Sequence, residues 1–470
     1  MDKEKTQAFV DENYEKLFVE PLMEFVKIDN LSPAYDKEYF TNGKNEKAIE
    51  LVKAYAEEQK IDGLSFEVFS EPNKPAIVTI VVEGQGSQNL MLYGHLDKQP
   101  HMEGWDEGLG PCNPVIKNGL LDGRGSSDDG YAPFAALLAI KNVQLQGGKL
   151  PRICLVLETE EESGSPNLLY LMDKIKDRTG APDICICMDS GACDVESLWL
   201  TSSLRGVLMG DLKVEVLQPN KGAHSGLAGG VIPESFRIAQ QLLNRLEDLE
   251  TKIVNDAFQV DIPDYKREEA KEIAESQGNA IYEDFSWAEG VQPLSKDNIA
   301  EMYLNNVWRA QLSITGASGL PDCSIAGNVL RPSTTLRFSI RLPPPLDASK
   351  IADVAVDILT KDPPFGAKVS VSNSHAGGGW LAKQPAPWVK EALDVASNDF
   401  YGKPCRSYGV GGSIPFLGEL GKKFPDAQIL AIGVLASSSN AHNPNENIDL
   451  EYTKKLICSL SHIVAAAGAH

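Results

Sequence analysis

RICLVLE, at residues 152–158, is an almost unbroken apolar run, and a second run, DICICM, follows at 183–188 after a helical pattern at 167–176. A similar run, LMLYG at 90–94, precedes a further helical pattern at 131–147. Strands that are apolar on both faces are typical of parallel sheets, whose crossovers are helices. The pattern therefore predicts a layered α/β domain with a mostly parallel sheet.

The pattern changes in the middle of the chain. Residues 206–218 (GVLMGDLKVEVLQ) and 334–342 (TTLRFSIRL) alternate apolar and polar side chains, which is typical of a sheet with one exposed face. Helical patterns lie between them, and the α/β pattern returns after a run of three glycines. We therefore predict a discontinuous α/β domain formed by residues 1–204 and 377–470, with an inserted α+β domain at 205–376.

The composition excludes some classes of partner. The 470-residue chain is 42% hydrophobic, which is enough to fill large cores. Its net charge of −22 repels nucleic acid, because phosphate binding needs clustered Lys and Arg. The sequence has no apolar run of about 18 residues, the length that would indicate a transmembrane helix. Residues 1–18 carry charges throughout, so they lack the apolar region of a signal peptide. We expect a cytoplasmic protein that binds neither nucleic acid nor membranes.

The eight cysteines are scattered without a regular spacing. Cys154, Cys185 and Cys187 lie in apolar runs, which is typical of reduced thiols buried in strands. A Cys-x-Cys metal or redox site at Cys185 and Cys187 is the alternative. Buried reduced thiols agree with a reducing cytoplasm.

Histidine and acidic residues follow several of the predicted strands. His95 and Asp97 lie in YGHLD, at the end of a buried run. A histidine there can bind a metal while a neighbouring carboxylate orients its ring. Taken alone, the motif more often describes a structural histidine. Asp128 lies in GRGSSDDG, just before a predicted helix. It is either an N-cap carboxylate or a carboxylate that bridges two cations.

Three adjacent glutamates, Glu160, Glu161 and Glu162, follow RICLVLE. They describe either a solvated acidic loop or ligands of a dication, with one glutamate acting as general base. Asp189 follows DICICM, and His442 follows a later predicted strand. Because ligands bind beyond the carboxyl ends of parallel strands, we expect these side chains to converge. Such imidazole and carboxylate donors suit two divalent ions of Zn, Mn or Co rather than Ca.

The order of these motifs resembles the aminoacylase/carboxypeptidase family of dinuclear metallopeptidases, and within it the carnosinase-like cytosolic dipeptidases. The resemblance covers nearly the whole chain. It implies a phosphorylase/hydrolase-like catalytic domain and an inserted lid domain that carries dimer contacts. The matching motifs are His95-x-Asp97, Gly123-Arg124-Gly125-x-x-Asp128-Asp129, Glu161-Glu162-Ser163-Gly164-Ser165, Asp189, Gly411-Gly412-Ser413-Ile414-Pro415 and His442.

The resemblance implies a role for each metal-ligand residue. One metal is held by His95 and Asp189, and the other by Glu162 and His442. Asp128 bridges the two ions. The metals implied are two divalent ions per subunit, Zn or Mn.

The resemblance also implies the remaining catalytic roles. Glu161 is the general base and later the acid, and Asp97 holds the ring of His95. His224, in the lid, stabilises the oxyanion, commonly in the site of the partner subunit of a homodimer. Taken alone, His224 and His375 are more often plain surface or core histidines. The substrate contacts implied are Arg341 and Ser413 for the carboxylate, with Asn328, His375 and Gly412 as further contacts.

The expected reaction is hydrolysis of the amide bond of dipeptides or small peptide-like substrates with a C-terminal carboxylate. Three residues depart from the dipeptidase pattern: Lys98 replaces a usual Val, Gly130 replaces a usual Lys, and Val410 replaces an acid that meets the free amino end. Val410 favours an alternative, an N-acyl amino acid amidohydrolase on the same scaffold. A non-catalytic binding protein would require a lost ligand or base, and none is lost.

Overall fold

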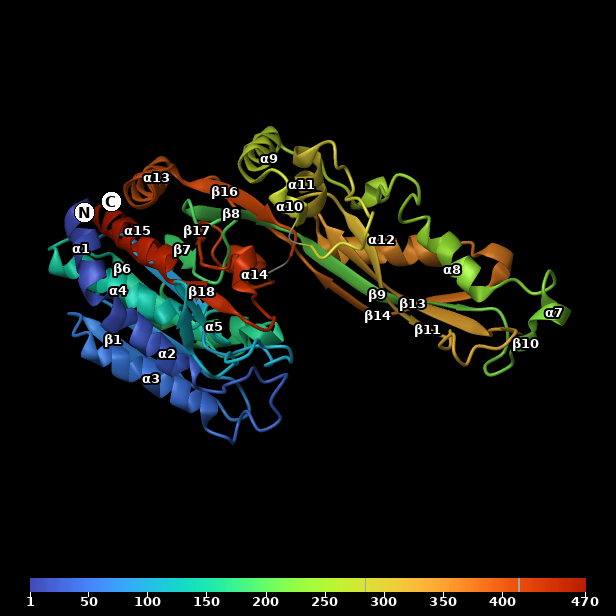
Figure 1. Ribbon diagram of the computed structural model, residues 1–470, viewed down its shortest axis with the longest axis horizontal. Coiled ribbons are helices and arrows are strands. Elements are labelled where there is room, and N and C mark those ends of the chain that lie inside the picture. Colours follow the sequence, from blue (N-terminus) through green and yellow to red (C-terminus); the bar gives the residue numbers. More distant parts are fainter. Residues whose placement is uncertain (284, 413–414) are drawn as a thin grey trace. The chain divides into compact units, whose positions relative to one another are not determined.

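The computed structural model describes residues 1–283, 285–412 and 415–470, and the chain forms two compact units (Figure 1). Unit 1 comprises Met1–Ser202, Ala382–Tyr408 and Glu419–His470. Unit 2 comprises Ser203–Leu381 and Gly409–Gly418.

A twisted sheet forms the centre of unit 1. Its four central strands, β6, β3, β7 and β17, are parallel, and the strands that flank them are antiparallel. This confirms the predicted α/β fold, and it places the carboxyl ends of the central strands at one edge. In spatial order the strands are β1 (Leu64–Phe69), β2 (Ile77–Val82), β6 (Arg152–Glu158), β3 (Asn89–His95), β7 (Ile184–Cys187), β17 (Gln428–Ala431) and the first residues of β8 (Trp199–Leu204).

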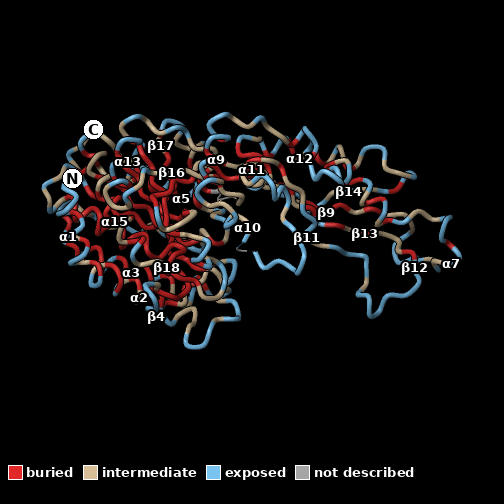
Figure 2. Tube along the Cα trace, turned by 45° about the horizontal axis from the view of Figure 1, so that its top comes forward, coloured by how far each residue is buried: buried red, intermediate tan, exposed pale blue. Residues whose placement is uncertain are grey.

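Helices and a small sheet complete unit 1. Helix α4 (Ala132–Leu145) is buried over most of its length and packs against β3, β6 and the closing helix α15 (Leu450–Ala469). Figure 2 shows buried residues concentrated around α15 and β18. A three-stranded antiparallel sheet consists of β4 (Val115–Lys117), β5 (Leu120–Asp122) and β18 (Asn447–Asp449). The other helices are α1 (Lys3–Tyr14), η1 (Glu15–Val19), α2 (Glu20–Val26), α3 (Lys44–Glu58), η2 (Glu161–Ser163), α5 (Leu168–Lys174), α6 (Lys176–Thr179), α13 (Pro387–Tyr401) and η5 (Ser437–Ser439).

Unit 2 is built on a four-stranded antiparallel sheet in the order β11 (Gln311–Ser318), β13 (Ser333–Leu342), β9 (Gly206–Glu215) and β14 (Lys368–Gly377). Along β9 and β13 buried residues alternate with partly exposed ones, as the sequence pattern predicts. The buried face packs against α8 (Ser235–Leu243) and α12 (Ala348–Thr360). On the opposite face, called the open face below, the alternate residues of β9 and β13 are partly or fully exposed.

Within and just beyond segment 255–305, the helices α9 (Asp264–Gln277) and α11 (Ile299–Val307) pack against each other. The shorter elements that begin in unit 2, or at its ends, are β10 (Ala223–His224), α7 (Ser225–Ala228), η3 (Asp256–Phe258), α10 (Ala280–Glu283), β12 (Val329–Leu330), η4 (Pro364–Gly366), β15 (Trp380–Leu381), β16 (Arg406–Val410) and α14 (Pro415–Lys423). Among the described residues, the helices are too short or too polar to cross a membrane.

Candidate metal centre

The carboxyl ends of three neighbouring strands, β3, β6 and β7, bring four polar side chains together. His95 is the last residue of β3, which lies between β6 and β7. Glu161 and Glu162 form the short helix η2 just after β6, and Asp189 lies two residues beyond β7. Because these strands are parallel, their carboxyl ends meet at one edge, and the four side chains converge there.

A second pairing brings in Asp128 and His442, which are far apart in the sequence. Asp128 lies between β5 and α4, and His442 lies just before β18. Strands β5 and β18 pair antiparallel, with Asn447 opposite Asp122. This pairing places the two ligand loops side by side at the edge where β3 ends.

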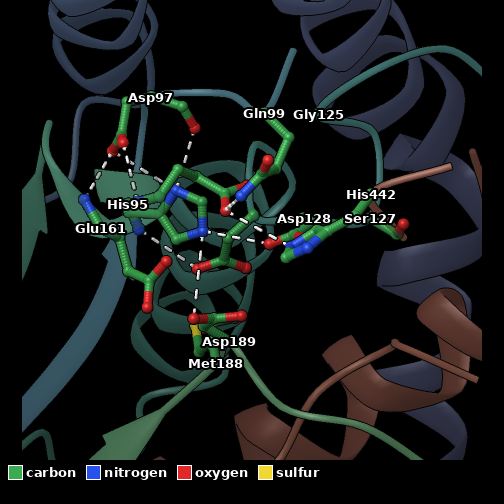
Figure 3. Close-up of polar contacts among 12 residues, drawn as sticks. His95, Asp97, Gln99, Gly125, Ser127, Asp128, Glu161, Met188, Asp189 and His442 are labelled. Atoms are coloured by element: carbon green, nitrogen blue, oxygen red, sulfur yellow. Dashed lines mark hydrogen bonds and ion pairs between the residues drawn. The ribbon is translucent and has the colours of Figure 1, made fainter. Parts of the chain in front are cut away.

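The carboxylate of Asp128 lies between the two histidines (Figure 3). Its Oδ1 is 3.1 Å from His95 Nε2, and its Oδ2 is 3.0 Å from His442 Nε2. Glu162 Oε2 lies 3.3 Å from His442 Nε2, and Asp189 Oδ2 lies 3.9 Å from His95 Nε2. The structure therefore brings all five predicted metal-ligand residues into one cluster.

Burial strongly perturbs the protonation of this cluster. It would lower the pKa of His95 by itself, but hydrogen bonding with Asp128 raises that pKa well above its ordinary value. Burial raises the pKa of Asp189 to about 6. Burial, together with Asp189 for Glu161 and Asp128 for Glu162, raises the pKa of both glutamates well above the usual range. The two imidazoles therefore do not offset the mutual repulsion of all these buried carboxylates.

The donor set fits divalent metal ions. Donor atoms of His95, Glu161 and Asp189 lie within 4.8 Å of one another, as do those of His95, Asp128 and Glu162. Glu162 Oε1 is buried without a hydrogen-bond partner. Imidazole and carboxylate donors in such groups are typical of Zn and Mn sites.

The carboxylate of Asp97 contacts the backbone of the glutamates more closely than it contacts the ring of His95. Its Oδ1 accepts from the N–H of Glu161 at 3.1 Å, and its Oδ2 from the N–H of Glu162 at 3.0 Å. His95 Nδ1 lies 3.0 Å from the Asp97 carbonyl oxygen and 3.6 Å from the carboxylate. Gln99 Nε2 donates to Glu162 Oε2 at 2.6 Å. This short segment therefore orients both glutamates.

A buried ion pair between Arg124 and Glu446 joins the two ligand loops, and sequence reasoning did not assign it a role. Arg124 Nη1 donates to Glu446 Oε2 at 2.6 Å, and Nη2 donates to the carbonyl of Asn443 at 3.1 Å. Glu446 Oε1 accepts from the N–H groups of Gly125 at 3.0 Å and Asp128 at 3.3 Å. The available signals were the arginine between two glycines and the acid four residues after His442.

Two departures from the dipeptidase pattern meet at Phe25. Lys98 is fully buried, and its ammonium lies 4.6 Å from the ring centroid of Phe25. It donates to the carbonyls of Phe25, Val26 and Ile28 at 3.0, 3.1 and 2.7 Å, which satisfies the end of α2. A Cβ added to Gly130 would lie 2.3 Å from the Phe25 ring. The packing of Phe25 therefore requires a glycine at position 130.

The substrate contacts implied by resemblance lie in unit 2. Arg341 and His375 are on β13 and β14, opposite Val207 and Met209 of the intervening strand β9. Because residues opposite each other share a face, both side chains belong to the open face of the sheet. This face is the one that α8 and α12 leave uncovered.

His224, which the resemblance implies as a catalytic residue, and Asn328, an implied substrate contact, lie at the short β10–β12 pair. His224 is opposite Val329, and it is exposed. Its Nδ1 accepts from the N–H of Gly226 at 3.1 Å. Asn328 is exposed next to this pair, and its carbonyl accepts from the N–H of Ser225 at 2.9 Å. The two residues are therefore neighbours.

The segment around Val410 is bonded to a buried arginine that sequence reasoning missed. The backbone N–H of Arg205 donates to the Val410 carbonyl at 3.3 Å, and its Nε donates to the Gly411 carbonyl at 3.0 Å. Val410 and Gly412 are partly exposed. Ser413 lies outside the described residues.

The fold and the imidazole–carboxylate cluster together define a metal-dependent hydrolase. The chain belongs to peptidase family M20/M25/M40, whose sequence profile matches residues 91–466. This confirms the family and the metallopeptidase class that the motifs indicated.

Relatives and solved structures agree with this assignment. The chain is 27% identical over 400 residues to the cysteinylglycine-S-conjugate dipeptidase of Corynebacterium striatum, covering 83% of this chain and 84% of that protein. It is 27% identical over 408 residues to the Cys-Gly metallodipeptidase of Saccharomyces cerevisiae, covering 83% and 82%. Human carnosine dipeptidase 1 shares the fold, with a TM-score of 0.72 at 20% identity over 100% of this chain and 99% of that chain.

Proposed function

We propose that the chain is a dinuclear metal-dependent dipeptidase, which hydrolyses dipeptides or small peptide-like substrates with a C-terminal carboxylate. The observation that carries this proposal is Asp128, whose two carboxylate oxygens contact His95 and His442 separately. A carboxylate in this position can bridge two cations. The names of the relatives, which specify dipeptide substrates, support the substrate class.

Under this proposal, His95 and Asp189 would hold one ion, Glu162 and His442 would hold the other, and Asp128 would contact both. When bound, such ions polarise a substrate carbonyl and lower the pKa of a water molecule. Zn and Mn both suit these donors. Two bound dications also offset the repulsion among the buried carboxylates.

Glu161 is the proposed general base. Burial and the neighbouring Asp189 raise its pKa, so the metal-free carboxyl readily holds a proton. It takes a proton from the attacking water and delivers it to the nitrogen of the leaving amine. The bond from its backbone N–H to Asp97 Oδ1, at 3.1 Å, positions it for both transfers. Asp97 thus acts through the placement of Glu161 and through the ring of His95.

We propose residues 205–376 as a lid domain, through which a cytoplasmic homodimer forms, and 1–204 with 377–470 as the catalytic domain. Arg341 lies on the open face of the lid sheet, and a guanidinium suits a substrate carboxylate because the two can form paired hydrogen bonds. His224 is the proposed oxyanion donor of the partner's site. The further substrate contacts proposed are Ser413, Gly412, Asn328 and His375.

An N-acyl amino acid amidohydrolase is the second candidate, and Val410 favours it. A free α-amine is recognised by an acid, and an aliphatic side chain occupies this position instead. The Val410 and Gly411 carbonyls are engaged by Arg205, at 3.3 and 3.0 Å. A blocked, apolar amino end is compatible with this surface.

A matched substrate panel separates the two candidates. The Mn- or Zn-loaded protein is given free dipeptides and their N-acylated counterparts, and amine release is measured. We expect cleavage of the free dipeptides; preference for the acylated set would establish the amidohydrolase. Val410→Asp should shift the ratio of kcat/KM values towards free dipeptides by about tenfold, the value of one charged contact. If two metals bind and neither set is cleaved, the dipeptidase proposal is wrong.

A further inference from the structure

Asp29, His101 and Cys112 form another cluster of metal-ligand side chains in unit 1, outside the proposed catalytic centre. They come from three segments: the turn after α2, the loop after β3 and the turn before β4. One donor atom of each lies within 4.8 Å of the other two. Across the described residues, three donors this close occur elsewhere only in the two groups around His95.

Two of the three side chains are already oriented by their neighbours. His101 Nε2 lies 2.6 Å from Asp29 Oδ1, and the His101 carbonyl accepts from Trp105 Nε1 at 2.8 Å. The other ring nitrogen, Nδ1, is buried without a partner. Asp29 Oδ2 accepts from Lys44 Nζ at 2.5 Å. Carboxylates that bind metals are commonly hydrogen-bonded on their outer side in this way. The inner oxygen, Oδ1, is the one that pairs with His101, so an ion would replace that contact.

The third donor is the thiol of Cys112, which is partly buried. Its turn is held by the bond from the Arg124 N–H to the Pro111 carbonyl, at 2.9 Å. Burial raises the pKa of this thiol, while the nearby Lys98 lowers it. A metal ion deprotonates a coordinating thiol, and the proton is released to solvent. The Lys98 ammonium donates to three carbonyls at the end of α2, so it already has its own acceptors.

We propose that Asp29, His101 and Cys112 bind one divalent ion of the Zn class, separate from the catalytic ions. A thiolate selects Zn, Co or Cd over Mg or Ca. Donor bonds of about 2.0–2.3 Å place tetrahedral donors about 3.3–3.7 Å apart, so small side-chain movements close the site. The fourth position is left for water. The ion fixes the loop that follows Gln99, whose amide contacts Glu162.

Cobalt alone is the probe that tests this site. The full chain is stripped with a chelator and titrated with Co²⁺, while bound metal and the absorption spectrum are recorded. The proposed catalytic ligands are nitrogen and oxygen donors, so a thiolate-to-cobalt charge-transfer absorption reports on the cysteine site. Cys112→Ser should bind one equivalent less than wild type and lose this absorption. Cys323→Ser, at an exposed cysteine of unit 2, should retain both.

A second measurement needs no variant. Bound Zn²⁺ should slow alkylation of Cys112 in the wild-type chain by about tenfold or more, because coordination removes the free thiolate. Peptide mapping distinguishes Cys112 from the other cysteines. Equal cobalt binding and equal spectra for wild type and Cys112→Ser, or alkylation that Zn²⁺ does not slow, would overturn the proposal. If the protein fails to bind the catalytic ions but shows the thiolate absorption, the cysteine site is supported and the proposed dinuclear function is contradicted.

Discussion

Replacing Glu446 with glutamine tests how the two ligand loops are kept in place. The side chains of Arg124 and Glu446 are 1% and 0% exposed, and Arg124 Nη1 lies 2.6 Å from Glu446 Oε2. The substitution leaves the guanidinium buried without its counter-charge. Removing one partner of a buried ion pair costs about 3–5 kcal/mol. We therefore expect the free energy of unfolding of the metal-free protein to fall by that amount.

The same substitution should weaken metal binding. Glu446 Oε1 accepts from the N–H of Asp128 at 3.3 Å, and Arg124 bonds the carbonyl of Asn443, next to His442, at 3.1 Å. Loss of such outer partners typically lowers metal affinity about 10–100-fold. Competition with a chelator of known affinity measures this change directly.

Urea unfolding of the chelator-treated protein, followed by circular dichroism and tryptophan fluorescence, measures the stability change. Glu419→Gln is a matched control, because Glu419 is 42% exposed and pairs with Lys422 on the surface. It should change the stability by about 0.5 kcal/mol or less. The double variant Arg124→Met with Glu446→Leu should recover only part of the stability, because no charge stays buried but the N–H groups of Gly125 and Asp128 lose their acceptor. It should not recover the metal affinity. A loss below about 1 kcal/mol for Glu446→Gln, with wild-type metal affinity, would refute the reasoning.

Three further predictions concern the acidic residues around the centre. Glu161→Gln should keep the bound metal and lower kcat about 100-fold or more, as loss of a general base does. The control is Glu160→Gln, which should stay near wild type because the Glu160 carboxylate is hydrogen-bonded to Asn167. Equal kcat values for the two variants would exclude Glu161 as the base. Asp97→Asn loses one of the acceptors for the N–H groups of Glu161 and Glu162, so kcat should fall about 10–100-fold. The metal content, measured by atomic emission, should stay unchanged. Loss of metal would mean that the main role of Asp97 is to hold His95. Burial raises the pKa of Glu158 to about 8 from an ordinary value of 4.5, so the folded state retains a proton that the unfolded chain releases. The melting temperature of the chelator-treated protein should therefore fall as the pH rises from 4.5 to 8. If the melting temperature of Glu158→Gln depends on pH as that of the wild type does, this prediction is wrong.

Much of the metal centre could be predicted from where the apolar strands end along the chain. RICLVLE and DICICM became β6 and β7, and LMLYG lies within β3 between them. Because parallel strands end at one edge, residues just beyond them must meet there. This reasoning placed His95, Glu161, Glu162 and Asp189 in one cluster without any knowledge of distances.

Local pattern also predicted the inserted sheet. Alternation of apolar and polar residues along 206–218 and 334–342 requires one covered face, and the structure provides it with α8 and α12. The alternation placed Arg341 on the open face, because its neighbours Ile340 and Leu342 are apolar and buried. Periodicity is a property of the chain itself, so it can be recognised before the fold is known.

Only the tertiary structure decided which polar groups meet across long stretches of sequence. The sequence contained Arg124 and Glu446, but their pairing depends on the contact between β5 and β18. Lys98 gave no sign that it would reach the end of α2, because a buried lysine is recognised only by the acceptors around it. Asp97 was expected to serve His95, yet its carboxylate lies nearer the backbone of η2. The position of each strand along the chain follows from local patterns, whereas the direction of a long polar side chain follows from partners that other segments supply.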